Sequence, residues 1–199
     1  MTQVSMSALI AGATSGKLVS FPTDTVPALA VRPDCSELIF AAKQRNQEKP
    51  LILMGDSPKS LLPFVRGTAA QLEIWQKVAH QHWPGALTLV LPASARVPAA
   101  MNPTDPTTIG VRVPSSRIAI AILSQTGPLA TTSANRSGQP PLATMAEIEA
   151  QFPDVLTLDP SELEATQTVS IGIPSTVAKW TNNGWQILRQ GSVQIEPYP

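Results

Sequence analysis

The sequence predicts an α/β fold built on one twisted, mixed β-sheet, and three observations lead to this prediction. Short apolar segments of strand length interleave with longer segments that carry apolar residues at helical spacing. The 20 prolines are spread along all 199 residues, which indicates many rigid turns and no single flexible linker. An apolar fraction of 43% with only 14% charged residues is typical of a globular chain with a sizeable core. No internal repeat or boundary is evident, so we expect one domain over residues 1–199.

The first half of the chain alternates expected helices and strands. Two capping-box patterns predict helix starts, namely Asp34 followed by Glu37 and Thr68 followed by Gln71. A further helix is expected at 5–15, and strands are expected at 17–21, 28–31, 51–54 and 87–91. Because residues 51–54 are all apolar, we expect that strand to be covered on both faces.

The second half begins with an irregular segment, 92–106, whose composition suggests a surface loop that could close over a ligand. Ser115 or Ser116 is expected to cap one helix, and Thr144 with Glu147 another, which Pro153 ends. Strands are expected at 108–113, 128–133, 155–158, 176–180 and 185–189. The pair Asn183-Gly184 between the last two strands predicts a hairpin turn.

Charge, cysteine count and hydropathy exclude several classes of protein. Fourteen basic residues balance 14 acidic ones, so a basic nucleic-acid-binding surface over the whole protein is not indicated, although a local basic cleft remains possible. The single cysteine, Cys35, excludes an intrachain disulfide framework and a cysteine-based zinc site. We find no apolar run of membrane-spanning length and no signal-peptide pattern, so we expect a cytoplasmic protein.

Small polar groups gather where the strand in 128–133 is expected to end. This stretch runs from an apolar segment into Ser133-Ala134-Asn135, and such groups can hold a ligand without filling its space. A turn at 22–25 is also rich in hydroxyls, although it could simply bond its own backbone. A second hydroxyl-rich turn spans 170–176.

Basic residues supply the other candidates for ligand binding. Lys43, Arg45 and Lys49 follow an expected helix, where cations either complement the helix dipole or bind phosphates. Arg112 lies between two valines of an apolar strand and therefore needs an anionic partner, either an internal carboxylate or a bound carboxylate or phosphate. Arg189 ends the last strand. No glycine-rich phosphate-binding motif occurs, so a nucleotide would be held by scattered cations and hydroxyls.

Taken in order, the motifs resemble those of a known family over about residues 18–191. They are Ser20-Phe21-Pro22-Thr23-Asp24-Thr25-Val26, Lys43-Gln44-Arg45, Lys49-Pro50-Leu51-Ile52, His82-Trp83-Pro84-Gly85-Ala86-Leu87-Thr88, Val111-Arg112-Val113-Pro114, Thr132-Ser133-Ala134-Asn135-Arg136-Ser137-Gly138, Pro174-Ser175-Thr176-Val177 and Ile187-Leu188-Arg189-Gln190-Gly191. Each motif is weak alone, but this order is specific. The chain resembles the YrdC-like family, the threonylcarbamoyl-AMP synthases, in its short, single-domain form.

The resemblance implies an α/β fold with a concave cationic cleft, and it also implies a reaction. L-threonine, bicarbonate and ATP would give L-threonylcarbamoyl-adenylate and pyrophosphate. Downstream transfer proteins would then modify adenosine 37 of tRNA, with possible contact between this chain and RNA and none with a membrane. Mg²⁺ would arrive with ATP, because the chain offers no dedicated metal cage. No covalent nucleophile is needed, since positioning and charge stabilisation can provide the catalysis.

The resemblance also assigns roles to residues. The expected ATP-binding residues are Lys43, Arg45, Lys49, Thr108, Ser133, Asn135 and Arg189, and of these Lys43, Arg45, Ser133 and Asn135 are expected to be catalytic. The expected threonine-binding residues are Thr25, Arg112, Thr131 and Ser175. Arg112 suits a carboxylate because its guanidinium can form a bidentate pair.

The chain departs from the family pattern at Pro27-Ala28, Asn46, Met54 and Pro141. Many members have Tyr-Gly, proline, histidine and, in some cases, serine at these positions. Two alternatives to the synthase follow: a non-catalytic module that binds double-stranded RNA or a nucleotide, or a carbamoyl-adenylate-forming enzyme with another amine acceptor. Neutral overall charge counts against the first alternative.

Overall fold

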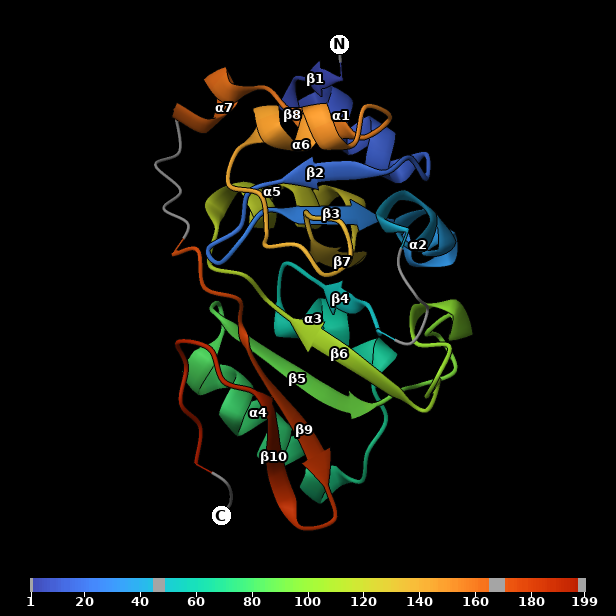
Figure 1. Cartoon of the computed structure of the whole chain (residues 1–199). Helices are drawn as coiled ribbons and strands as arrows, with labels where there is room; N and C mark the ends of the chain where they lie inside the picture. Colours follow the sequence, from blue (N-terminus) through green and yellow to red (C-terminus); the bar gives the residue numbers. More distant parts are fainter. Residues whose placement is uncertain (1, 45–48, 165–170, 197–199) are drawn as a thin grey trace.

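The computed structural model describes residues 2–44, 49–164 and 171–196. Within these residues, ten strands form a single mixed sheet in the order β1-β8-β2-β3-β7-β4-β6-β5-β9-β10 (Figure 1). This confirms the predicted α/β class with one mixed sheet. No helix in the described part of the chain is long and apolar enough to cross a membrane.

The strands are short, and parallel and antiparallel pairs mix along the sheet. Their bounds are β1 (Gln3–Val4), β2 (Val19–Phe21), β3 (Ala28–Val31), β4 (Ile52–Met54), β5 (Leu87–Pro92), β6 (Thr108–Arg112), β7 (Leu129–Ser133), β8 (Leu156–Leu158), β9 (Thr176–Thr181) and β10 (Gly184–Arg189). The pairs β1/β8, β2/β8, β4/β6 and β5/β9 are parallel, and the other neighbours are antiparallel. The polar strand β7 therefore lies in the interior of the sheet, between β3 and β4.

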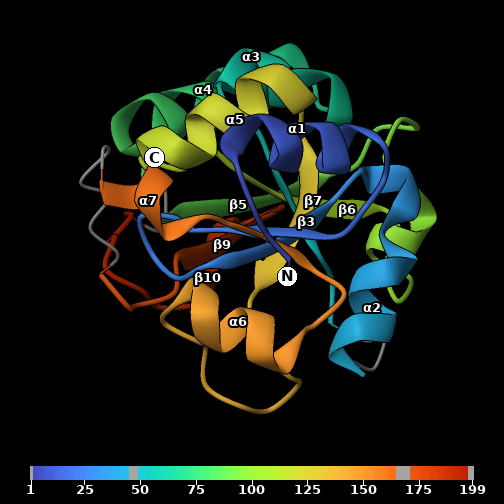
Figure 2. The ribbon, with the colours of Figure 1, turned by 90° about the horizontal axis from the view of Figure 1, so that it is seen from above.

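Helices cover both faces of the twisted sheet around β3 and one face of it beyond β7. They are α1 (Met6–Thr14), α2 (Glu37–Lys43), α3 (Pro58–Leu61), α4 (Ala69–His82), α5 (Arg117–Thr126), α6 (Met145–Gln151) and α7 (Pro160–Glu164). Around β3, α1 and α5 lie on one side and α6 on the other (Figure 2). Alternate residues of β3 accordingly join different cores: Leu29 and Val31 join the cluster with α2 and α6, and Ala28 and Ala30 join the cluster with α1 and α5.

The strands on the other side of β7 have one covered face and one open face. Leu89 and Val111 pack toward α3 and α4, whereas Ile52, Val90 and Gly110 point away from these helices into a large cavity. The prediction that strand 51–54 is covered on both faces is therefore wrong at Ile52, which is half-buried and lines the cavity, whereas Leu51, Leu53 and Met54 are at most 4% exposed. Its apolar side chains are divided between the core and the floor of the cavity.

Several local predictions are confirmed by side-chain contacts. Two of the three predicted capping patterns, at Thr68 and Thr144, are formed by reciprocal hydrogen bonds with the residue three positions later. Ser116 caps α5 through Ala119 N. The turn at Asn183-Gly184 connects the antiparallel strands β9 and β10, as the sequence predicted.

Other local predictions were wrong. Asp34 does not cap a helix, because its carboxylate pairs with Arg32 instead, and α2 begins only at Glu37 without a side-chain cap. The 92–106 segment is not wholly surface-like, since Met101 is fully buried and its carbonyl accepts a hydrogen bond from Leu51 N (2.8 Å). The elements β1, α3 and α7 were not predicted, because they are too short to show a hydrophobic periodicity.

Candidate active site

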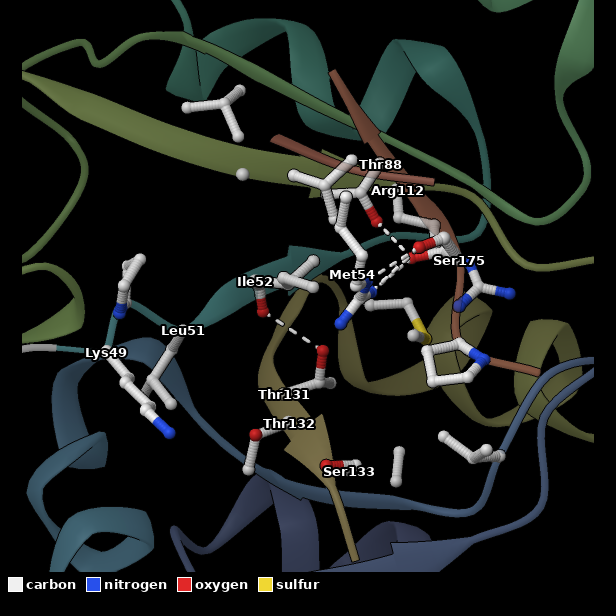
Figure 3. Close-up of a pocket in the computed structure, with 18 of the residues that line it drawn as sticks. Lys49, Leu51, Ile52, Met54, Thr88, Arg112, Thr131, Thr132, Ser133 and Ser175 are labelled. Atoms are coloured by element: carbon white, nitrogen blue, oxygen red, sulfur yellow. Dashed lines mark hydrogen bonds between the residues drawn. The ribbon is translucent and has the colours of Figure 1, made fainter. Parts of the chain in front are cut away.

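A cavity of about 640 Å³ lies over the face of β4, β5 and β6 that points away from α3 and α4 (Figure 3). Every predicted site residue in the described part of the chain lines it: Thr25, Lys43, Lys49, Thr108, Arg112, Thr131, Ser133, Asn135, Ser175 and Arg189. The remaining one, Arg45, lies outside the described residues. The structure thus gathers side chains from distant parts of the sequence into one place.

Strand register sets the order of side chains across the cavity floor. Ile52 pairs with Thr131 on one side and with Gly110 on the other, and Val90 pairs with Gly110 and Lys179. These residues form a row across five strands. Within this row, Thr131 is also joined to Ile52 by a side-chain hydrogen bond, since its hydroxyl donates to Ile52 O (3.0 Å).

The floor has two chemically different ends on either side of this row. Arg112 and Thr88 lie toward one end, next to Ser175, and Thr108 lies toward the other. Figure 3 shows Lys49 on the side of the cavity opposite Arg112 and Ser175. A ligand that spans the cavity would therefore meet different groups at its two ends.

Arg112 is buried at its end of the cavity, with 4% of its surface exposed. Its Nη2 donates to Asp24 Oδ1 (2.8 Å), its Nη1 to Thr25 Oγ1 (2.8 Å) and its Nε to Gly85 O (3.1 Å). Burial lowers the pKa of the guanidinium, and the carboxylate of Asp24 opposes that shift. Asp24 is thus an internal anionic partner, yet a guanidinium carries more donors than these contacts use. N–H groups remain for a ligand that enters the cavity.

The turn that carries Asp24 and Thr25 bonds its own backbone and also serves Arg112. The hydroxyl of Thr23 donates to Val26 O (2.7 Å) and accepts from Thr25 N (3.2 Å). Ile171 N and Gly172 N donate to the carbonyls of Asp24 (3.2 Å) and Thr25 (2.9 Å). The two hydroxyl-rich turns identified in the sequence are therefore joined to each other.

Ser175 is held by a small network beside Arg112. Its hydroxyl shares a hydrogen bond with Thr88 Oγ1 (2.8 Å) and accepts one from Arg189 Nη2 (3.2 Å). Arg189 also donates to Ser175 O from Nε (3.0 Å) and Nη2 (2.8 Å). Burial lowers the pKa of Arg189. Thr88 was missed as a site residue. Its hydroxyl within an otherwise apolar strand, directly after Trp83-Pro84-Gly85, was a usable signal.

Lys43 holds the polar end of β7 from the end of α2. It is 2% exposed, and its Nζ donates to Ser133 O and to Asn135 Oδ1 (3.3 Å). Ser133 Oγ donates to the same amide oxygen (2.6 Å), and Asn135 Nδ2 donates to the carbonyls of Arg136 (2.8 Å) and Gln139 (2.6 Å). Through these contacts, Lys43 and Asn135 position the loop between β7 and α6. Their roles toward ATP stay predictions.

A polar group of residues 102–108 lines the end of the cavity that Lys49 shares. Asn102 Nδ2 donates to Thr108 Oγ1 (3.1 Å), and that hydroxyl donates to Asp105 Oδ2 (3.2 Å). Among the described residues that line the cavity, basic side chains outnumber acidic ones: Lys43, Lys49, Arg112, Lys179 and Arg189 stand against Asp105. This balance favours an anionic ligand. Asn102, Asp105 and Lys179 were not predicted. Asn102 and Asp105 lie in the irregular segment before β6, and Lys179 reaches the cavity through the register of β9.

No group of three potential metal-ligating side chains occurs among residues 2–44, 49–164 and 171–196.

Gly191 packs so closely against the segment of Ser175 that any side chain would displace it. A Cβ at this position would lie 2.4 Å from Pro174 O and 2.5 Å from Thr176 N. We expect Gly191→Ala to lower stability by about 1–3 kcal/mol, the usual cost of overpacking, and to raise the KM for the ligand of the Ser175 end. Thermal melts and steady-state kinetics measure both effects, with the exposed neighbour change Ser192→Ala as control. A variant with unchanged melting and KM would contradict this role.

Comparison with known sequences places the chain in a family. A family model named Sua5_yciO_yrdC, described as "Telomere recombination", matches residues 13–191. The chain is 34% identical over 181 residues to the threonylcarbamoyl-AMP synthase of Vibrio campbellii, which covers 89% of this chain and 94% of that protein. Identity to the Escherichia coli threonylcarbamoyl-AMP synthase is 31% over 150 residues, which covers 73% of this chain and 78% of the relative.

Solved structures agree with the sequence comparison. Pyrococcus abyssi Sua5 complexed with L-threonine superposes with a TM-score of 0.81 at 30% identity, covering 94% of this chain and 54% of that one. This chain therefore spans about half the length of the P. abyssi protein. E. coli YciO superposes with a TM-score of 0.79 over 98% of this chain and 92% of its own, and at 22% identity this likeness shows the fold. The family match over most of the sequence and the shared fold lead to one conclusion: the chain belongs to the Sua5/YciO/YrdC family.

Proposed function

We propose that this protein is a threonylcarbamoyl-AMP synthase, which makes L-threonylcarbamoyl-adenylate and pyrophosphate from L-threonine, bicarbonate and ATP. One observation carries the proposal: every described residue that the sequence assigned to ATP or threonine lines the same cavity of about 640 Å³. The relatives named as threonylcarbamoyl-AMP synthases and the L-threonine complex of P. abyssi Sua5 support it. The product would serve tRNA modification in the cytoplasm, through partner proteins that transfer the threonylcarbamoyl group.

In this proposal, threonine binds at the Arg112 end of the cavity. The remaining N–H groups of Arg112 would pair with the substrate carboxylate, because a guanidinium can donate two parallel hydrogen bonds to it. The hydroxyls of Thr25 and Ser175 lie at the same end and would orient the amino acid, and Thr131 would contact it from the middle row of the floor. The amine of threonine would then point along the floor toward the rest of the cavity.

ATP enters with its Mg²⁺ as a substrate complex and occupies the remainder of the cavity. Ser133 and the loop that Lys43 and Asn135 hold would contact the nucleotide, and Lys49 and Thr108 would contact its phosphates from their end of the cavity. Arg189, which donates to Ser175, would contact the phosphate nearest the threonine. The threonine amine adds to CO2, derived from bicarbonate, and loses a proton to give a carbamate. A carbamate oxygen attacks the α-phosphorus, and the bond to pyrophosphate breaks. Fixed donors around the phosphates would stabilise the charge that develops there.

The direct test is pyrophosphate release by the purified protein. With ATP, Mg²⁺, bicarbonate and L-threonine, we expect release that depends on threonine and yields threonylcarbamoyl-adenylate by mass spectrometry. Reactions without threonine or bicarbonate are the controls. A folded protein that releases no threonine-dependent pyrophosphate would exclude the proposed activity.

A second candidate, the same chemistry with another amine acceptor, is favoured by apolar side chains that share the cavity with Arg112. Pro27, Ala28, Met54 and Pro174 all line the cavity. These side chains offer no hydrogen-bond donor to an acceptor side chain. The same pyrophosphate assay with a panel of amino acids decides between the two. A preference for threonine over valine supports the synthase, and the reverse preference supports the second candidate.

A further inference from the structure

Lys179 is a cation in the cavity that neither the motifs nor the proposed mechanism uses. It lies on β9, in the middle row of the floor, where it pairs with Val90 of β5. Its side chain is 35% exposed, so its ammonium group is accessible from the cavity.

The ion pair of Lys179 is loose. Its Nζ lies 3.7 Å from Asp105 Oδ2, whereas a charge-assisted hydrogen bond between such groups is about 2.7–2.9 Å long. Both side chains are partly exposed, at 35% and 41%, and exposed ion pairs contribute little to stability. No hydrogen bond joins the Lys179 ammonium group to the part of the chain that the structure describes. Lys179 can therefore leave Asp105 at little cost.

Asp105, by contrast, keeps its place without Lys179. Its carboxylate accepts hydrogen bonds from Thr107 N (3.3 Å), Thr107 Oγ1 (2.5 Å) and Thr108 Oγ1 (3.2 Å). The hydroxyl of Thr107 lowers the pKa of Asp105 most among the groups that lower it, and Lys179 lowers it least. Asp105 thus remains ionised and fixed at the end of the cavity that Lys49 shares.

We propose that Lys179 is a polyphosphate-binding residue that exchanges Asp105 for the phosphate chain of the ligand. The ligand class rests on the proposed function, in which this end of the cavity receives the triphosphate of ATP. The compact charge of a lysine ammonium suits phosphate oxygens, and Lys49 and Thr108 line the same end. In the free protein Asp105 neutralises Lys179, and the ligand replaces it. Asp105 then repels the phosphates and limits how tightly they bind.

The exchange predicts opposite effects for its two partners. Inorganic triphosphate in the presence of EDTA is the probe, so that no metal ion takes part, and isothermal titration calorimetry gives its Kd. We expect Lys179→Gln to raise the Kd about tenfold, as befits the loss of one charged contact. Asp105→Asn should lower the Kd about threefold, because it removes a repulsive charge and releases Lys179. Lys179→Arg should keep most of the affinity.

Controls separate this role from a loss of fold. Lys77→Gln removes an exposed lysine of α4 that does not line the cavity, and it should bind triphosphate like the wild type. Circular dichroism and melting curves should show all variants folded, since both partners are partly exposed. Asp105→Asn should also lower the Kd by a smaller factor in the Lys179→Gln variant than in the wild type, because part of its effect acts through Lys179.

The outcomes distinguish this inference from the proposed function. If Lys179→Gln binds triphosphate as well as Lys77→Gln does, or if Asp105→Asn weakens binding, the inference is wrong while the proposed function stands. A wild-type protein that binds no triphosphate and releases no pyrophosphate overturns both. Opposite shifts for the two variants, with coupling between them, support the exchange.

Discussion

Arg112→Ala is expected to remove nearly all threonine-dependent pyrophosphate release while ATP binding persists. Truncating one partner of a buried, hydrogen-bonded charge pair costs about 2–5 kcal/mol, which corresponds to a loss of roughly 30-fold to several thousandfold. The loss should fall on kcat/KM for threonine, because the remaining donors of Arg112 would meet the substrate carboxylate. Steady-state kinetics for threonine and equilibrium titration of ATP measure the two effects separately.

Arg112→Ala should also lower the stability of the fold, so its effect on catalysis must be separated from this loss with matched variants. Asp24 is only 13% exposed and would lose its cationic partner, which destabilises a fold by about 3–5 kcal/mol for a fully buried pair. The double variant Arg112→Ala with Asp24→Asn removes the orphaned charge and should recover stability but no threonine use. Arg117→Ala, at an exposed position of α5, is the control for arginine loss. Equal losses of ATP and threonine binding in a folded double variant would reject the assigned role.

Lys43→Met is expected to raise the KM for ATP strongly, with a smaller effect on threonine. The change leaves the carbonyl of Ser133 and the amide oxygen of Asn135 without their buried cationic donor. Both acceptors keep a neutral donor, Asn135 N for Ser133 O (3.1 Å) and Ser133 Oγ for Asn135 Oδ1 (2.6 Å), so the change removes hydrogen bonds to a charged group, worth about 1.5–3 kcal/mol each. The loop between β7 and α6 would lose its side-chain tie to α2 and keep the backbone hydrogen bond from Ser137 N to Lys43 O (3.4 Å). A rise in KM for ATP of about tenfold to a hundredfold follows if that loop shapes the nucleotide site.

Two measurements test this reading of Lys43. Lys17→Met replaces an exposed lysine that does not line the cavity, and its KM values should match the wild type. Hydrogen exchange in residues 134–142 should increase in Lys43→Met if the loop is loosened. If the KM of this variant rises for threonine and not for ATP, the assignment of Lys43 to the nucleotide site is wrong.

The sequence predicted those parts of the fold that depend on local chemistry. Capping boxes at Thr68 and Thr144 and the hairpin at Asn183-Gly184 act over a few residues, so their signals survive in the folded chain. Asp34 carried a similar signal, but Arg32 two residues earlier formed an ion pair with it instead. A charged neighbour can thus outcompete a backbone N–H for the same carboxylate.

Strand register is the information that the sequence lacked. An all-apolar strand such as β4 does not reveal that Ile52 faces a cavity, because that depends on which strands stand beside it. For the same reason nothing near Lys179 in the sequence pointed to Asp105. Thr88 stood inside one of the motifs and was still missed, whereas Lys179 reaches the cavity through the pairing of β9 with β5 and Asp105 through the loop before β6.

The contacts of Arg112 have a thermodynamic consequence for the whole sheet. Arg112 belongs to β6, and Asp24 and Thr25 belong to the turn between β2 and β3, so these hydrogen bonds join the parts of the sheet on either side of β7. A substrate held by Arg112 and by Thr25 would act as a second cross-link between those parts. Any ligand that binds only the folded state raises apparent stability by mass action. Resistance to unfolding in this protein would thereby depend on the concentration of any ligand that Arg112 and Thr25 hold.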